Sequence, residues 1–431
     1  MRTVWFFVLF LPCFSCLSGQ TWIRCSDGLP TDTAVSSLVV FGNAIYAGTQ
    51  HAGIYKSMDK GATWTNAGFY DPIRKPIIKA FASIDTFLFA AATSNGIYRT
   101  SLHSTTWTPV NNGIPKGNGN LVMFDIINVG DTLYAASNGG GIFMSADTGN
   151  HWQLLYNNLG LNDHRVLSLA SNHQFLFAGT AGTNYTMPDT GVAFLTPRHQ
   201  GSSWTVNNTG LSRNGAHLEA TTAFAANDTV AYIGTDDVGI HRSTDNGHTW
   251  HQVAGTELNG DIWAIKITGA QVYYGTSYHG IFTSDDGGLT FYENNVGLNF
   301  GNISIPELVD DFVVDEPYIY AATSTGVFKQ LIEPVTGLYE SSLPLSMISV
   351  RVYPMPFCNE TTFEVSTRTI ESKLIIRIMD VFGKEVKQVS THVDQYSTSV
   401  RMDREGMEAG IYFYTIAINN IILGSGKLVV E

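Results

Sequence analysis

The chain has 431 residues, of which 44% are hydrophobic and only 14% are charged, and it contains 42 glycines. This length suits a large repeat domain followed by a small one, and the glycine content is typical of β-rich proteins with many tight turns. The net charge of -13, without a run of lysines or arginines, excludes nucleic acid as an expected partner, because phosphate binding requires a basic surface.

Residues 1–19 have the pattern of a signal peptide. Arg2 precedes an apolar run from Val4 to Leu11, and small residues follow, which is the arrangement of a secretory leader. The run is shorter than the roughly 20 residues that a membrane-spanning helix needs, and no later stretch is long enough. We therefore expect an exported protein without a transmembrane segment.

A unit of two apolar strands separated by a glycine recurs seven times between residues 45 and 328. Successive glycines before the second strand lie 41 to 50 residues apart. They are Gly53, Gly96, Gly141, Gly191, Gly239, Gly280 and Gly326. This period fits one four-stranded blade of a β-propeller. The sequence thus predicts an all-β fold with a seven-bladed propeller over residues 20–334.

Each unit except the seventh is followed by an aromatic residue that introduces a fourth strand. These aromatic residues are Trp64, Trp107, Trp152, Trp204, Trp250 and Phe291. The segment TWIRCSDGL at 21–29 resembles TWTPVNNGI at 106–114, although no unit precedes it. We expect this N-terminal strand to close the ring as the outer strand of the last blade, because an incomplete sheet would expose its edge. Trp22 should then pack beside Phe328.

Four octapeptides share a turn pattern: SMDKGATW (57–64), SADTGNHW (145–152), STDNGHTW (243–250) and SDDGGLTF (284–291). They resemble the Asp-box of sialidase-like propellers, S-x-D-x-G-x-T-W, which is also called the bacterial neuraminidase repeat. The aspartate can accept hydrogen bonds from turn amides, the glycine can take a positive φ, and the aromatic side chain can be buried. A catalytic centre is needed once, whereas this motif recurs, so we interpret it as structural. The structural residues are Ser57, Asp59, Gly61, Trp64, Asp147, Gly149, Trp152, Ser243, Asp245, Gly247, Trp250, Ser284, Asp286, Gly288 and Phe291.

Polar and aromatic residues lie in the loops expected at the opposite end of the blades. The candidates for a ligand-binding rim are His51, Tyr185, Asp237, Tyr278 and His279. Such a rim could bind a glycan or a protein. Ordinary solvated loops have the same composition, and we favour that simpler interpretation.

A hydrolase is the alternative interpretation. A sialidase needs an arginine cluster and a tyrosine with a glutamate partner, and the F/Y-R-I/L-P segment of that family is absent. Xyloglucan-hydrolysing enzymes resemble this chain in their Asp-boxes but place an acidic pair between two rings, whereas this chain has room for one. Asp125, Asp261, Asp310 and Asp311 lie at or near first strands without a spacing that pairs them. No metal-ligand spacing, phosphate loop or nucleophile elbow occurs, so we predict no catalytic residue, metal or cofactor.

Residues 335–348 have the pattern of a linker, and residues 349–431 have short alternating strands that predict a small Ig-like β-sandwich. YPMPF at 353–357, DVFGKEV at 380–386, AGIYFY at 409–414 and the closing KLVV resemble the type A sorting domain of the type IX secretion system of Bacteroidetes. Met355 departs from that pattern, in which asparagine is usual.

This resemblance implies export through the periplasm, with the type IX machinery as partner, to the outer cell surface or the extracellular space. Together with the leader, it predicts a secreted or surface-displayed propeller that acts as a binding or scaffold module. The alternative function is a glycoside hydrolase, either sialidase-like or polysaccharide-cleaving.

Overall fold

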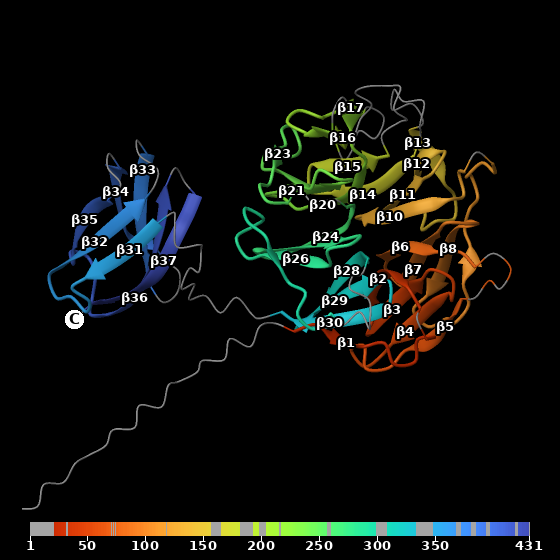
Figure 1. Ribbon diagram of the computed structural model, residues 1–431, viewed down its shortest axis with the longest axis horizontal. Helices are drawn as coiled ribbons and strands as arrows, with labels where there is room; N and C mark the ends of the chain where they lie inside the picture. Colours follow the sequence, from red (N-terminus) through yellow and green to blue (C-terminus); the bar gives the residue numbers. More distant parts are fainter. Residues whose placement is uncertain are drawn as a thin grey trace, which may run out of the picture. The chain divides into compact units, whose positions relative to one another are not determined.

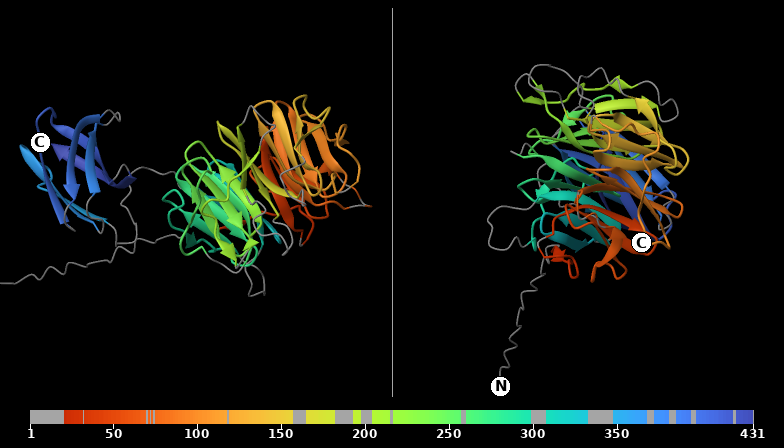
Figure 2. Two further views of the ribbon diagram at one scale, coloured as in Figure 1. Left: turned by 90° about the horizontal axis from the view of Figure 1, so that it is seen from above. Right: turned by 90° about the vertical axis from the view of Figure 1, so that its right-hand side faces the viewer.

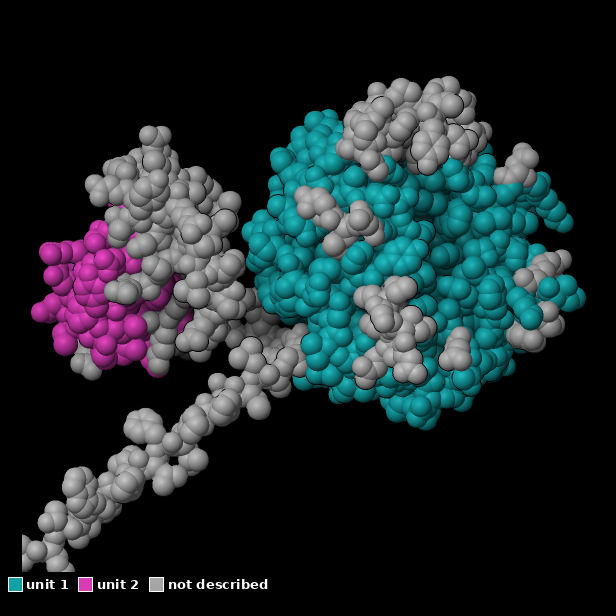
Figure 3. Space-filling model, viewed as in Figure 1, with its two compact units in different colours: residues 1–332 teal, residues 333–431 magenta. Residues whose placement is uncertain are grey.

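The computed structural model describes residues 21–332 and 348–430, apart from short internal stretches. The stretches left out are 32, 70, 72, 74, 118, 157–164, 182–192, 198–203, 215–216, 257–259, 299–307, 368–371, 381–384, 394–396 and 419–420. The chain divides into two compact units, with the boundary between Ile332 and Glu333 (Figure 3). The predicted signal peptide and nearly all of the predicted linker lie outside the described residues.

Unit 1 consists of antiparallel sheets arranged around an axis, and all its described regular structure is β-strand (Figures 1 and 2). Four sheets have the order of the chain. The first holds β2 (Val35–Phe41), β3 (Ala44–Thr49), β4 (Ile54–Ser57) and β5 (Thr65–Phe69). The second holds β6 (Ile78–Ile84), β7 (Phe87–Ala92), β8 (Gly96–Ser101) and β9 (Thr108–Pro109). The third holds β10 (Met123–Val129), β11 (Thr132–Ser137), β12 (Gly141–Ser145) and β13 (Gln153–Tyr156). The fourth holds β14 (Val166–Ser171), β15 (Phe175–Thr180), β16 (Ala193–Pro197) and β17 (Thr205–Val206).

Three further four-stranded sheets follow a short hairpin of β18 (Arg213–Asn214) and β19 (His217–Leu218). The fifth sheet holds β20 (Thr221–Ala226), β21 (Ala231–Thr235), β22 (Ile240–Ser243) and β23 (His251–Gln252). The sixth holds β24 (Ile262–Thr268), β25 (Gln271–Thr276), β26 (Ile281–Ser284) and β27 (Tyr292–Glu293). The last holds β28 (Val309–Asp315), β29 (Tyr318–Thr323), β30 (Gly326–Leu331) and the N-terminal β1 (Ile23–Arg24).

The N-terminal strand completes the sheet whose other strands come from the end of unit 1. β1 pairs with β30, so that Ile23 lies opposite Lys329 and Arg24 lies opposite Phe328. Trp22 is only 1% exposed and belongs to the same buried cluster as Phe328. β28 of this sheet also contacts β2 of the first sheet. The segment that resembles 106–114 thus serves as a fourth strand, as its sequence predicts.

Tryptophan side chains bond neighbouring sheets together. In each case the tryptophan precedes an outer strand, and its indole Nε1–H donates to a backbone carbonyl in or just after the outer strand of the preceding sheet. These bonds are Trp64 to Cys25 at 2.7 Å, Trp107 to Ala67 at 3.0 Å, Trp152 to Val110 at 2.7 Å, Trp250 to Asn207 at 3.1 Å and Trp22 to Asn294 at 2.9 Å. The last of these connects the N-terminal segment to the sixth sheet, so this segment is bonded to two sheets.

A glycine brings the backbones together at these contacts. Gly28 has a φ of 91°, and a Cβ there would lie 2.2 Å from the carbonyl oxygen of Trp64. The amide of Trp64 donates to the carbonyl of Asp27 at 2.8 Å. Only glycine fits such a contact and such a φ without strain.

Unit 2 is a sandwich of two antiparallel sheets. One has the order β31 (Ile348–Tyr353), β32 (Glu360–Thr367), β35 (Ser397–Asp403). The other has the order β34 (Glu385–Val393), β33 (Ser372–Met379), β36 (Gly410–Ile418), β37 (Ile421–Val430). A buried cluster that includes Phe363, Ile376 and Tyr414 fills the space between them. Alternating strands with one apolar face account for this arrangement.

Candidate functional site

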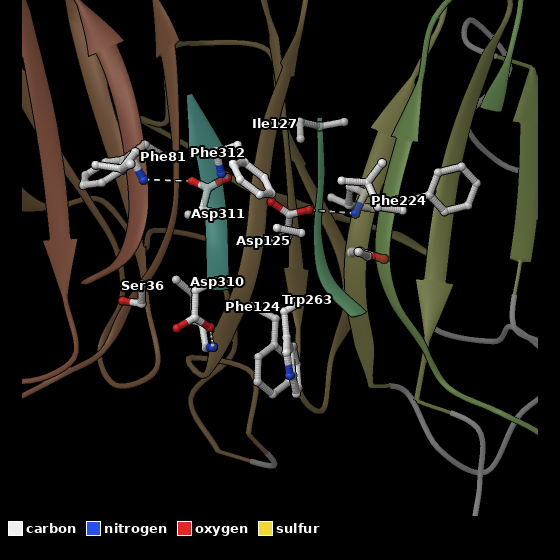
Figure 4. A pocket seen from close by; sticks show the side chains of 18 of the residues that line it. Ser36, Phe81, Phe124, Asp125, Ile127, Phe224, Trp263, Asp310, Asp311 and Phe312 are labelled. Atoms are coloured by element: carbon white, nitrogen blue, oxygen red, sulfur yellow. Dashed lines mark hydrogen bonds and ion pairs between the residues drawn. The ribbon is translucent and has the colours of Figure 1, made fainter. Parts of the chain in front are cut away.

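The first strands of the seven sheets surround an axial cavity of about 600 Å³ (Figure 4). Val309, the first residue of β28, pairs with Thr323, the last residue of β29. The start of a first strand therefore lies at the same end of the sheet as the loop between the second and third strands. We call this end the entry end. Every first strand has a register shift near its start. Such a bulge interrupts the alternation of side chains, and in six strands both residues at the bulge line the cavity.

The bulges generate two rings of equivalent residues. The entry ring, nearer the entry end, is Ser36, Lys79, Phe124, Leu167, Thr222, Trp263 and Asp310. The bulge ring, one residue further along each strand, is Ser37, Ala80, Asp125, Ser168, Ala223, Ala264 and Asp311.

The two aspartates of the bulge ring connect neighbouring sheets. Asp311 accepts the amide of Phe312 on Oδ1 at 2.7 Å and the amide of Leu38 on Oδ2 at 2.8 Å. Asp125 accepts the amides of Ile126 and Leu169 in the same way, both at 2.7 Å. One amide in each pair belongs to the next sheet. All four oxygens therefore bind backbone, and the two carboxylates act as struts between β28 and β2 and between β10 and β14.

Burial shifts the ionisation of both struts. It raises the pKa of Asp125 to about 7 and that of Asp311 to about 6, although the bonded amides act in the opposite direction. The charge of Asp311 raises the pKa of Asp125 further. A carboxyl that titrates near neutrality can serve as a general acid, but amides at every oxygen restrict these two to a structural role.

The entry ring holds an incompletely satisfied charge. Oδ1 of Asp310 lies 3.7 Å from Nζ of Lys79, and the two side chains are 4% and 24% exposed. Oδ2 of Asp310 has no hydrogen-bond partner among the described residues. Nζ of Lys79 also lies 5.5 Å from the centroid of the Trp263 ring, close enough for a cation–π contact. Burial raises the pKa of Asp310, and Lys79 together with the neighbouring side chain of Gln50 offsets part of this effect.

A pair of hydrogen-bonded carboxyls lies on the rim beside this ring. Asp236 and Asp261 share a hydrogen bond, which together with burial raises the pKa of Asp236 to about 7. Oγ of Ser277 donates to Asp261 at 3.2 Å and accepts Nε1–H of Trp263 at 2.9 Å. A chain of hydrogen bonds therefore links the rim pair to Trp263 of the entry ring.

The predicted rim residues are not gathered at one place. Tyr278 and His279 lie beside Gly260, next to Asp261, and Asp237 adjoins Asp236 with a φ of 64°. These three predicted residues therefore lie near the carboxyl pair, and Tyr278 is 59% exposed. His51 lies in the loop between β3 and β4 of the first sheet, where its Nδ1 is 3.0 Å from the carbonyl oxygen of Lys75. Tyr185 lies outside the described residues.

The four predicted turns lie at the end opposite the entry ring. In the first, Oγ of Ser57 donates to Asp59 and accepts the amide of Gly61, each at 2.8 Å. Asp59 also accepts the amide and hydroxyl of Thr63, which lower its pKa to about 2. The same bonds form around Ser243, Asp245 and Gly247, and around Ser284, Asp286 and Gly288; Ser145, Asp147 and Gly149 lack only the threonine.

These turns also contact the preceding sheet. A Cβ on Gly61 would lie 3.2 Å from the Tyr320 ring, and one on Gly149 would lie 2.8 Å from the Phe89 ring. Gly247 and Gly288 approach Phe177 and Tyr232 in the same way. The tryptophans of three turns, Trp64, Trp152 and Trp250, are buried, and Phe291 is half-buried. These residues are thus occupied by contacts within and between sheets.

The composition of the described residues bears on ligand chemistry. Within the described part of the chain, no three His, Cys, Asp or Glu side chains are grouped as a metal site would require. The described residues that line the axial cavity include no arginine and no tyrosine. The arginine cluster and tyrosine of a sialidase are therefore not found at this cavity.

The two units of the chain are similar to different families of known proteins. Residues 351–431 match the family model of the secretion system C-terminal sorting domain. This chain carries a type IX sorting domain. The domain indicates secretion through the type IX system to the cell surface or the extracellular space, and the secretion machinery handles the chain. No helix of the described residues has the length and hydropathy of a membrane span.

Residues 15–126 match the family model of the DUF6242 beta propeller domain. A xyloglucanase of Hypocrea jecorina is 27% identical over 270 residues, which make up 61% of this chain and 30% of that protein. The chain thus spans less than a third of that relative.

Solved structures agree on the propeller fold of unit 1. YCF48 from Cyanidioschyzon merolae superposes with a TM-score of 0.54 at 13% identity, over 72% of this chain and 98% of that one. A xyloglucanase from Xanthomonas campestris superposes with a TM-score of 0.52 at 12% identity, over 80% and 59% of the two chains. At such identities the similarity shows the fold alone.

The sequence did not single out Lys79, Phe124 or Trp263 as candidates for the site. An alignment of the seven repeats at their bulges would have identified them, because it places all three in one ring. Asp236 and Asp261 belong to different sheets, and nothing in their spacing predicts that their carboxyls meet.

Proposed function

We propose that unit 1 is a seven-bladed propeller, closed by its N-terminal strand, that acts outside the cell as a binding or scaffold module. The entry end of its axial cavity is the binding surface. The observation that carries this proposal is the open entry ring, with an unpartnered carboxylate oxygen and partly exposed aromatic side chains, above carboxylates that are already bonded. Cavities of this size with a few polar groups are ordinary ligand sites.

A glycoside hydrolase is the second candidate, favoured by the xyloglucanase relative and by the raised pKa of Asp236. Glycosidases hold their two carboxyl groups about 5 to 9.5 Å apart, so that a water molecule or the sugar fits between them. Asp236 and Asp261 are in direct hydrogen-bond contact, which leaves no such space. The struts Asp125 and Asp311 have all their oxygens on backbone amides. The geometry therefore supports binding over hydrolysis.

The two functions can be separated with the mature chain. A glycan and peptide array tests binding, and incubation with xyloglucan and with sialylated glycans, followed by reducing-end and free-sialic-acid measurements, tests hydrolysis. We expect a retained ligand and no released product. Turnover that is lost in Asp261→Asn would instead establish the hydrolase, whereas absence of any ligand would refute both functions.

For the C-terminal unit we propose residues 349–431 as the sorting domain, with residues 1–19 as signal peptide and 335–348 as linker. A chain truncated after Ser341 should accumulate in the periplasm, because the sorting signal is lost. Immunoblots of periplasmic, surface and medium fractions measure this. Appearance of the truncated chain outside the cell would contradict the assignment.

The Asp-box-like turns complete the proposal as structural elements. Their bonds recur in four sheets, their glycines pack on the preceding sheet, and they lie at the end away from the cavity. We assign them to stability of the ring and not to ligand binding.

A further inference from the structure

The entry ring departs from the repeat that builds the rest of the cavity. The bulge ring, one residue further along, contains only serine, alanine and aspartate, which are small or act as struts. The entry ring has seven different residue types at seven equivalent positions: Ser36, Lys79, Phe124, Leu167, Thr222, Trp263 and Asp310. A requirement of the fold would apply to each sheet alike. The diversity of this ring therefore indicates a requirement that the fold does not impose.

One acceptor in the ring is left open at a cost. The side chain of Asp310 is 4% exposed, and its Oδ2 has no partner with hydrogen-bond geometry among the described residues, although the side chain of Gln50 is near enough to lower the pKa of Asp310. A buried carboxylate oxygen without a donor is unfavourable, so a ligand that supplies a donor would stabilise it. Figure 4 shows Asp310 on the same level of the cavity as Phe124 and Trp263.

Charge decides which kind of donor fits. The position of a cation is already taken, because Nζ of Lys79 lies 3.7 Å from Asp310 and 5.5 Å from the Trp263 ring centroid, and Lys266 also lines the cavity. An anion would face Asp310 and the carboxylates of Asp125 and Asp311, with no arginine among the described lining residues. A neutral ligand with hydroxyl groups avoids both conflicts.

The aromatic side chains complete the site. Trp263 comes from β24 and Phe124 from β10, and both are partly exposed to the cavity. A sugar ring presents hydroxyl donors on its edge and C–H groups on its face, and these match an open carboxylate oxygen and an aromatic surface. Further from the entry end, in the upper part of Figure 4, the cavity is lined by the two struts and by apolar side chains such as Phe81 and Phe312. This lining suits the end of a glycan more than its middle.

We propose that the entry ring holds the uncharged terminal sugar of a glycan, with a hydroxyl donating to Oδ2 of Asp310 and the ring stacked on Trp263. This inference rests on the proposed binding function and names its ligand class and its contacts. The type IX sorting domain places such a module outside the cell, where glycans are accessible.

The test uses the mature full-length chain and a panel of methyl glycosides and neutral disaccharides, measured by saturation-transfer NMR and titration calorimetry. We expect at least one neutral sugar to bind. Asp310→Asn should weaken it on the order of tenfold or more, because it replaces a charged acceptor. Trp263→Ala should weaken it to a similar extent, and Trp263→Phe should weaken it less, because an aromatic face remains.

Two controls keep the outcomes distinct. Met58→Ala and Leu289→Ala alter exposed side chains in the turns at the opposite end of unit 1, and both should leave affinity unchanged. Melting curves identify any variant that fails to fold. If Trp263→Ala does not fold, the affinities of the conservative variants Trp263→Phe and Asp310→Asn still test the proposed site. Binding that is lost in Tyr278→Ala but kept in Asp310→Asn overturns the site while the binding function stands. Tight binding of only uronic or sialic acids, or only peptides, overturns the ligand class.

Discussion

Replacement of Trp22 by phenylalanine tests whether the N-terminal segment holds unit 1 together. Trp22 is 1% exposed, and its Nε1–H donates to the carbonyl of Asn294 at 2.9 Å across the junction between the last two sheets. Phenylalanine keeps an aromatic ring in the cluster around Phe312 and Phe328 but removes the donor. The carbonyl of Asn294 then loses this indole partner in a buried setting.

The expected loss follows from the energetics of buried hydrogen bonds. Leaving a buried acceptor unsatisfied costs about 1 to 3 kcal/mol, and the smaller phenylalanine adds a packing loss of about 1 kcal/mol. The total loss is about 2 to 4 kcal/mol, and each kcal/mol lowers the melting temperature by about 2 to 4 °C, so we expect the melting temperature to fall by about 4 to 16 °C.

Trp204→Phe provides the matched control. Trp204 occupies the equivalent position before β17, but its Nε1 has no acceptor among the described residues. The same atoms are deleted there without a described hydrogen bond, so the loss should be limited to packing, about 1 kcal/mol. Thermal melts and urea titrations of the mature chain measure both variants. Equal destabilisation by the two changes would refute the role of the bond between sheets.

Two further predictions concern the turns and the struts. Gly61→Ala should destabilise unit 1 by about 1 to 3 kcal/mol, because φ is 80° and the new Cβ would lie 3.2 Å from a neighbouring ring. Gly269→Ala, with a φ of 60° and nothing within 4 Å, should cost less, and a larger loss there would contradict the packing argument. The pKa values of Asp125 and Asp311, about 7 and about 6, are raised from about 3.9 in the unfolded chain, so their contribution to stability is full below pH 4 and is lost as the pH rises to about 7. The pKa of Asp59 is lowered to about 2, so its contribution to stability is lost as the pH falls below 4. Melting curves should therefore show maximal stability near pH 4 to 5. A melting temperature that rises from about pH 5 to 8 would refute the predicted effect of Asp125 and Asp311.

The repeat made the sheets predictable from sequence. Periodic glycines and the aromatic residues that follow them report local strand and turn geometry, and the resemblance of 21–29 to 106–114 located the strand that pairs with β30. The bonds between sheets were less accessible. That the tryptophan Nε1–H reaches the previous sheet depends on how neighbouring sheets pack, and the sequence predicted only its burial.

The site was predictable only in part for the same reason. Asp125, Asp310 and Asp311 were recognised as axial candidates, because they begin first strands. Asp310 and Asp311 are adjacent, but their roles differ. At the bulge, Asp311 accepts hydrogen bonds from two backbone amides, whereas Oδ2 of Asp310 has no hydrogen-bond partner among the described residues. A difference of one residue at a bulge decides which carboxylate is structural, and no periodicity reports it.

The positions of these features separate stability from binding. The turn and tryptophan bonds lie away from the entry ring, and the struts lie below it. The hydroxyl of Ser36 donates to the carbonyl of Ile78 in the neighbouring first strand at 2.8 Å. Among the described hydrogen bonds, none joins the side chain of Lys79, Trp263 or Asp310 to a neighbouring first strand. A serine at position 310 could meet the fold's requirement, whereas Asp310 carries the penalty of burial. The buried carboxylate of Asp310 destabilises the fold, so we infer that it serves ligand binding. Substitutions in the entry ring should therefore abolish ligand binding and leave the sheets folded.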